Sequence, residues 1–151
     1  MTQEFLNDYD ERVIALAQHL ELNLEPDFQF VDEDDTEEAQ EEARAEAIKE
    51  VTDELDCIVE GYDRNIFEYY GQEFYVLTDD EADEEWDRRL DNFLEELVYP
   101  KIPEHLRGYF DDEAWKEDAK TDGRGHTLSS YDGCEYEETV NEVTYFIYRV
   151  S

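Results

Sequence analysis

The chain has little positive charge, few cysteines and few residues that break regular structure. Its 151 residues include 12 Lys and Arg against 46 Asp and Glu, which leaves a net charge of -34 at pH 7. Nucleic acid and anionic membranes repel such an anion, so both are excluded as direct partners. Cys57 and Cys134 are too few for a disulfide framework and lack the CxxC spacing of a metal site. We therefore expect both to be small buried apolar residues.

Long apolar runs are also missing. No stretch approaches the roughly 18 apolar residues of a membrane span, and residues 1–5 lack the basic and apolar regions of a signal peptide. We therefore expect a cytosolic protein. High charge with low hydropathy is typical of disorder, but 11 Tyr, 8 Phe and 2 Trp supply aromatic area for a core. We expect a helical, acidic region over 1–60 and an α+β region over 61–151, together forming one compact unit.

Apolar residues at three- and four-residue spacings predict two helices in the first half of the chain. One covers residues 4–21. The other covers residues 36–60, where no Gly or Pro interrupts the chain. Asp35 and Glu38 have the spacing of a capping box, and the acidic start suits the positive end of the helix dipole. Between these helices we expect a short extended segment at Phe28, Phe30 and Val31.

The second half contains two pairs of β-branched and aromatic runs. The runs at 66–70 and 73–77, and those at 135–140 and 143–150, each flank a short polar or Gly-containing turn and predict a β-hairpin. The fold class is therefore α+β, an antiparallel sheet of two hairpins packed with several helices. The core is expected to contain aromatic and aliphatic residues from these strands and one helix, namely Phe74, Val76, Trp86, Tyr145, Ile147 and Tyr148.

Helices and turns connect the two hairpins. Thr78 and Glu81 have capping-box spacing before an apolar stripe, which predicts a helix over 79–97. Prolines then break the chain, and a short helix containing Trp115 follows. Glycines predict a loop before the second hairpin, at Gly123 and Gly125.

An acidic stripe on the helix expected at 36–60 is the most informative feature. Its nine acids over about 30 Å of helix axis amount to roughly one carboxylate per 3.3 Å, close to the roughly 3.4 Å per phosphate along one strand of B-DNA. Like charges four residues apart destabilise a helix, so their repetition indicates a function. The stripe consists of Asp34, Glu38, Glu42, Glu46, Glu50 and Glu54, with Glu37, Glu41 and Asp53 beside it.

Other interpretations of the acidity stay open. A charged run is commonly a solvated face that keeps a protein soluble, and few Lys among many acids also fits adaptation to concentrated salt. A Ca²⁺ site at residues 32–35 is disfavoured because the EF-hand spacing is missing. We expect no metal and no other cofactor. The Ala-rich side of the helix suits pairing with a second copy, so a homodimer is also open.

One glycine-rich loop holds residue types used in catalysis. Arg124 and His126 precede Ser129 and Ser130, which together are ingredients of a hydrolase or an anion nest. The signatures of a nucleophile elbow, a P-loop or an HExxH site are missing. We therefore expect no catalytic residue and interpret Arg124 as an internal counter-ion. Arg124 and His126 stay secondary candidates for a binding loop.

Four segments resemble a group of uncharacterised small acidic proteins from bacteriophages and prophages. They are EFYVLTDDEADE at 73–84, YFDDEAW at 109–115, DGRGHTLSSYDG at 122–133 and YFIYR at 145–149. The resemblance covers roughly residues 73–151 and leaves out the acidic helix. It implies a phage accessory protein that acts in the host bacterial cytoplasm. In size and charge alone, the chain is also similar to phage inhibitors of host defence that mimic DNA.

The leading hypothesis is a non-enzymatic, phage-encoded inhibitor of a host nucleic-acid enzyme of the restriction or CRISPR type. Its acids would replace phosphates on the basic nucleic-acid-binding surface of that enzyme. The alternative is a phage interaction module that binds through its loop and aromatic residues, with the acidity serving solubility or salt adaptation. The candidate partner-binding residues are Asp34, Glu37, Glu38, Glu41, Glu42, Glu46, Glu50, Asp53, Glu54, Asp79, Asp80, Asp83, Glu84 and Asp87.

Overall fold

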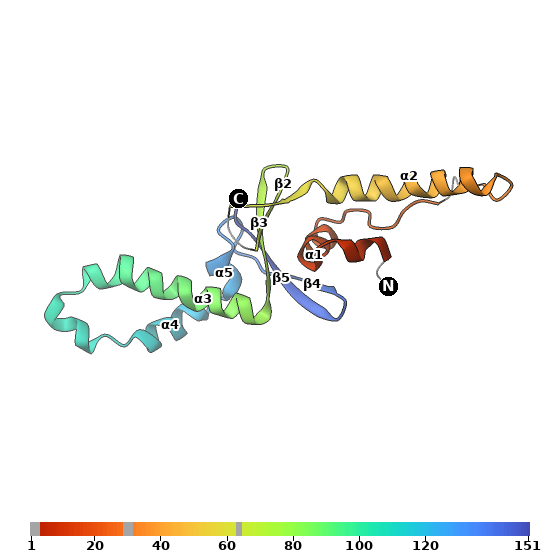
Figure 1. Cartoon of the computed structure of the whole chain (residues 1–151). Helices are drawn as coiled ribbons and strands as arrows, with labels where there is room; N and C mark the ends of the chain where they lie inside the picture. The colour runs from red at the N-terminus through yellow and green to blue at the C-terminus, as the bar shows by residue number, and fades with distance from the viewer. Residues whose placement is uncertain (1–3, 29–31, 63–64) are drawn as a thin grey trace.

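A five-stranded antiparallel sheet forms the centre of the fold (Figure 1). The computed structural model describes residues 4–28, 32–62 and 65–151. Within them the strand order is β1-β2-β3-β5-β4, which confirms the predicted α+β class. The strands are β1 (Ile58–Glu60), β2 (Ile66–Tyr69), β3 (Gln72–Thr78), β4 (Tyr136–Val140) and β5 (Val143–Arg149).

Both predicted hairpins are confirmed, and each closes through a two-residue turn. Tyr70 and Gly71 join β2 to β3 with φ values of 48° and 81°. Asn141 and Glu142 join β4 to β5 with φ values of 49° and 71°. Two consecutive positive φ values give a turn whose twist matches that of the flanking strands. The register that follows pairs Phe67 with Phe74 in the first hairpin.

Helices cover both faces of the sheet. On one face, α1 (Glu11–His19) and the last turns of α2 (Glu37–Leu55) pack with Phe74 and Val76. On the other face, α3 (Asp79–Phe93) and α5 (Arg124–Leu128) pack with Tyr75 and Leu77. Because alternate residues of β3 enter different cores, the strand has an uninterrupted apolar run although it is antiparallel. Five of the six expected core residues are buried, and Trp86 is half-buried beside the second core.

Two helical arms leave the sheet in opposite directions (Figure 1). One arm is α2. The other contains α3, a π-helical turn η2 (Leu94–Val98), two 3-10 segments η3 (Tyr99–Lys101) and η4 (Glu104–Tyr109), and the returning α4 (Asp112–Lys120). This shape gives an accessible surface of 10139 Å², against about 8,000 Å² for a compact chain of this mass. Divided among 34 net charges, it leaves about 300 Å² per charge.

The helix predictions for the first half need correction. Residues 4–21 form two pieces, η1 (Glu4–Asp8) and α1, because Asp10 ends the first and caps the second by accepting a hydrogen bond from the Arg12 amide at 2.9 Å. The N-cap of α2 is Thr36 rather than Asp35, and its hydroxyl accepts from the Ala39 amide at 3.2 Å. The extended segment expected at 28–31 lies largely outside the described residues.

The far end of the long helix and the glycine loop also differ from the predictions. The helix ends at Leu55 instead of residue 60, and Ile58 to Glu60 pair with β2 as a third strand of that hairpin. Gly123 has the positive φ of 91° expected in a tight connection, but Gly125 lies inside the short helix α5. A Cβ at Gly125 would lie 2.7 Å from the backbone of Cys134, so glycine is required there for close packing.

The expectation of two buried cysteines is wrong. Cys57 is half-buried and Cys134 is exposed. Both lie in connections between elements rather than on a strand or helix face, and both thiols find polar partners. The Cys57 sulfur lies 3.2 Å from the Tyr70 hydroxyl, and the Cys134 thiol donates to the Asp132 carbonyl at 3.5 Å.

Candidate functional site

Arg124 neutralises acids at the start of α3. Its side chain is only 10% exposed and forms ion pairs with Asp79 at 2.8 Å, Asp83 at 2.9 Å and Glu135 at 2.7 Å. The guanidinium also lies 4.5 Å from the centre of the Phe146 ring. Burial opposes the charged form, but hydrogen bonds to the carboxylates keep the pKa of Arg124 above its usual value. The predicted role as internal counter-ion is therefore confirmed.

Lysines of α4 neutralise further acids of α3. Lys120 pairs with Asp87 at 2.8 Å, and Lys116 pairs with Asp91. Three of the five candidate acids between Asp79 and Asp87 thus have an internal cation. The other two, Asp80 and Glu84, are exposed, and neither has an ion pair with the described residues. The α3 arm therefore has mixed charge, and its acids are less available to a partner than the sequence predicts.

Tyrosine hydroxyls donate hydrogen bonds to carboxylates both with and without a paired cation. Tyr145 donates to Glu11 at 2.8 Å, and Tyr148, which is fully buried, donates to Glu135. Burial, and then the hydrogen bond to Glu11, raises the pKa of Tyr145 to about 12. A phenol satisfies a carboxylate without adding charge. This use of tyrosine gives a physical reason for part of the tyrosine content of so acidic a chain.

The base of α2 is held by the same kind of contact. Tyr9 donates to Asp56 at 3.0 Å, and Tyr69 donates to Glu54. The pKa of Tyr69 rises to about 12, chiefly because of that hydrogen bond. Glu54 is half-buried, so it fixes the arm to the sheet instead of standing free on the stripe.

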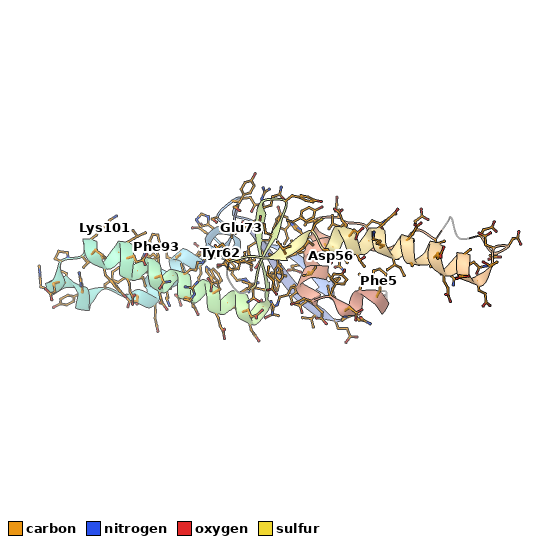
Figure 2. The ribbon with its side chains drawn as sticks, turned by 45° about the horizontal axis from the view of Figure 1, so that its top comes forward. Phe5, Asp56, Tyr62, Glu73, Phe93 and Lys101 are labelled. Atoms are coloured by element: carbon orange, nitrogen blue, oxygen red, sulfur yellow. The ribbon has the colours of Figure 1, made fainter. Side chains whose placement is uncertain are left out.

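The outer part of α2 is where unneutralised acids gather. Only Ala47, Val51 and Leu55 of this helix are buried, all in its second half. Side chains project from the rest of the arm into solvent (Figure 2). Within the described residues, the ion pair found for this helix joins Lys49 to Asp53 at 4.0 Å. The exposed acids without an ion pair to the described residues are Glu37, Glu38, Glu41, Glu42, Glu46 and Glu50.

The geometry of these acids keeps the spacing predicted from the sequence over a shorter length. Asp34 precedes the helix, where its amide donates to Asp32 at 2.9 Å. The seven acids from Glu37 to Asp53 span 17 residues, or about 26 Å, which is roughly one carboxylate per 3.6 Å. One strand of B-DNA has about one phosphate per 3.4 Å. The arm therefore presents anionic groups at nearly the axial density of a nucleic-acid strand.

The loop candidates do not assemble into a catalytic arrangement. Ser129 is buried, and its hydroxyl contacts Asp132 at 2.6 Å and the Arg149 carbonyl at 2.7 Å. Ser130 donates to the Val150 carbonyl at 3.1 Å. These hydroxyls tie the loop to the end of β5, while His126 is exposed. His19 lies elsewhere, on α1, where its ring packs against the rings of Phe74 and Tyr136 and burial lowers its pKa.

One feature was missed by the sequence reasoning. Phe93, Leu97, Leu106 and Tyr109 are between 45% and 86% exposed and line a cavity of about 580 Å³ at the turn between α3 and α4. The sequence predicts a helix from the apolar stripe of α3 but does not show which of its residues the sheet covers. The sequence contains a signal for this exposed apolar surface, because the stripe continues past the residues that face the sheet. It runs into a turn that is flanked by prolines and is too short to cover it.

Comparisons with known proteins add no relative. No protein-family model, curated protein or solved structure matches the chain. Residues 4–28, 32–62 and 65–151 contain no helix with the length and apolar character needed to cross a membrane. In the same residues, no group of three or more His, Cys, Asp or Glu is placed to hold a metal ion.

Proposed function

We propose that the chain is a non-enzymatic inhibitor that mimics DNA, with the outer part of α2 bound in the nucleic-acid channel of a host enzyme. Restriction and CRISPR enzymes are the class of target that fits the phage resemblance. The observation that carries the proposal is the set of six exposed acids on α2 that have no ion pair with the described residues. These acids replace the phosphates of a DNA strand against Lys and Arg of the partner.

The distribution of cations supports α2 over α3 as the binding arm. Ion pairs hold Asp79, Asp83 and Asp87 within the protein, so a partner would have to compete with Arg124 and Lys120 for them. The six exposed acids of α2 that have no ion pair with the described residues require no such exchange. We therefore assign the main contact to α2 and a minor one to Asp80 and Glu84.

Repulsion between its acids destabilises α2, and the proposed function gives a reason for keeping them. Glu38, Glu42, Glu46 and Glu50 are successive like charges four residues apart. Each such pair destabilises an isolated helix by about 0.2 to 0.5 kcal/mol. A basic partner surface converts this repulsion into attraction, because its cations lie between the carboxylates. Binding should therefore be fast at low ionic strength and should weaken steeply as salt is added.

The anchoring of α2 gives the arm a defined direction. Val51 and Leu55 lie in the first core, and the tyrosine contacts to Glu54 and Asp56 fix the last turn. A rigid arm loses less conformational entropy on binding than a disordered acidic tail does. This anchoring supports the proposal over an acidity that serves solubility alone.

The test compares two variants of equal charge. One carries Gln in place of Glu38, Glu42, Glu46 and Glu50. The control removes four exposed acids from the other arm, as Glu104→Gln, Glu113→Gln, Glu117→Gln and Asp118→Asn. Both have a net charge of -30 instead of -34. Each tagged protein is incubated with bacterial lysate at about 0.1 M and about 0.5 M salt, and DNA-displaceable partners are identified and purified.

We expect the unmodified chain and the control to retain a nucleic-acid enzyme at low salt, to release it to added DNA and to inhibit its activity. The α2 variant should lose all three properties. Equal binding by the α2 variant would remove this helix from the mechanism. A partner that persists at high salt and ignores DNA would favour the interaction-module alternative.

A further inference from the structure

The far end of the α3 arm carries an apolar trough that the proposed function does not use. Its outer part is the cavity of about 580 Å³ lined by Phe93, Leu97, Leu106 and Tyr109. Phe93 also lines a second cavity of about 380 Å³ together with Trp115, whose ring stacks on that of Phe93 at 5.5 Å. Phe93 is therefore common to both cavities, which we treat together as the tip trough, and the second cavity also has polar lining residues, namely Arg89, Asp122, His126 and Thr127.

The tip trough has the exposure of a binding surface rather than of a core. Leu97 is 49% exposed, Leu106 is 45% and Tyr109 is 86%. Exposed apolar side chains gathered in one concave site commonly mark an interaction surface in a soluble protein. Figure 2 places Phe93 and Lys101 on the arm that points away from α2. A partner at the trough can therefore bind while α2 is occupied.

The charge of the chain around the tip trough favours a basic occupant. Residues 91–113 include seven Asp and Glu against one Lys and one Arg, although the charged lining residues are Lys101 in the outer cavity and Arg89 and Asp122 in the second. Glu95 and Asp112 lie near the Tyr99 hydroxyl, where hydrogen bonding to Asp112 raises the pKa of Tyr99 to about 12, while Asp91 is already paired with Lys116. A second copy of the chain would bring another net charge of -34 to this rim. A partner with an apolar anchor and basic flanks is complementary in both respects.

We propose that the tip trough docks an amphipathic helix of a partner protein, with apolar residues on one face and Lys or Arg on the other. A helix laid in a groove places residues at positions i, i+3, i+4 and i+7 along it, which suits a site made of two adjoining cavities. The partner's basic face then meets the carboxylates of the rim. This docking is separate from phosphate mimicry, so each can fail without the other.

The test uses a synthetic 18-residue peptide of Leu and Lys, with leucines on one helical face and no aromatic residue. The protein carries 5-fluorotryptophan, and its two fluorine resonances are assigned with Trp86→Phe. Trp115 lines the second cavity next to Phe93, whereas Trp86 lines neither cavity and reaches the second one through its hydrogen bond to Thr127. We expect the peptide to shift the Trp115 resonance more than that of Trp86 at about 0.5 M salt, where loose ion pairing is screened.

Two variants show whether the trough is the site. Leu97→Ser with Leu106→Ser should raise the peptide Kd at least tenfold, because both leucines line the outer cavity. The control, Val59→Ser with Val143→Ser, alters apolar side chains of similar exposure on the sheet and should leave the Kd unchanged. Gln in place of the α2 acids should also leave it unchanged at this salt concentration.

Several results would overturn the docking proposal. An equal shift of Trp115 by a peptide of the same composition with leucines spread around the helix would show charge attraction alone. Equal binding of a Leu and Glu peptide at about 0.1 M salt, where charge is less screened, would refute the basic flanks. A dimer in sedimentation that is lost in Leu97→Ser would assign the trough to a second copy. A saturable shift with 1-octanol alone, and none with the peptide, would assign it to a small apolar ligand.

Discussion

Removing acids from the exposed part of α2 should strengthen this helix. Glu42 and Glu46 each have a like-charged neighbour four residues away on both sides, so Glu42→Gln with Glu46→Gln removes three repulsive pairs. At about 0.2 to 0.5 kcal/mol each, the helix gains roughly 0.6 to 1.5 kcal/mol. Neither side chain forms an ion pair within the described residues, so no stabilising contact offsets this gain.

The assay is thermal unfolding followed by circular dichroism at 222 nm, with hydrogen exchange of the α2 amides. For a chain of this size, the gain corresponds to a rise in Tm of about 1 to 6 °C if α2 unfolds with the sheet. The control, Glu60→Gln with Glu137→Gln, removes the same charge from exposed strand positions where no helical pair exists. A lower Tm or faster exchange in the α2 variant would refute the reasoning, since it would show that these acids support the fold.

Three further changes test the account of the fold. Arg124→Gln leaves a cluster of carboxylates without its cation and should lower the free energy of unfolding by about 2 to 3 kcal/mol in urea titration. The control Arg44→Gln, at an exposed site, should change the free energy of unfolding by under about 0.5 kcal/mol. Gly125→Ala places a Cβ 2.7 Å from backbone and should cost about 1 to 3 kcal/mol, while Gly108→Ala meets nothing within 4 Å and should cost nothing. Raising the pH from 10 to 12 should destabilise the fold, because the pKa of Tyr145 is about 12 in the fold and about 10 when unfolded. The contribution of Tyr145 to stability is therefore complete below pH 10 and is lost as its phenol ionises in the fold. Tyr145→Phe should show a smaller loss over that range in thermal unfolding.

Elements with strong local signals were predictable from the sequence. The capping box of Thr78 and Glu81 forms as expected, with the Thr78 hydroxyl bound to the Glu81 amide and the Glu81 carboxylate to the Thr78 amide. Each hairpin was predictable because its two runs and the turn between them lie within about 20 residues of chain. The end of α2 was not, since Ile58 and Val59 fit a helical stripe and a strand equally well. Pairing with β2 decides between them, and that contact is not local.

The candidate site was predictable in position but not in detail. Periodicity places the acids on one helix, yet it does not show which of them find a partner. Arg124 reaches Asp79 across 45 residues, and Tyr69 of β2 reaches Glu54 of α2. Such contacts depend on how the sheet orders its strands. The exposure of Phe93 and Leu97 depends in the same way on how far α4 runs back along α3.

The most direct test of the central claim is competition between this protein and a DNA duplex for the partner that the lysate experiment identifies. The apparent Kd of the protein for that enzyme is measured at increasing DNA concentrations and constant salt. If α2 occupies the nucleic-acid channel, the apparent Kd rises in proportion to DNA without a plateau, and Gln in place of Glu38, Glu42, Glu46 and Glu50 removes binding. A plateau, or a complex that holds protein, enzyme and DNA together, would contradict the account.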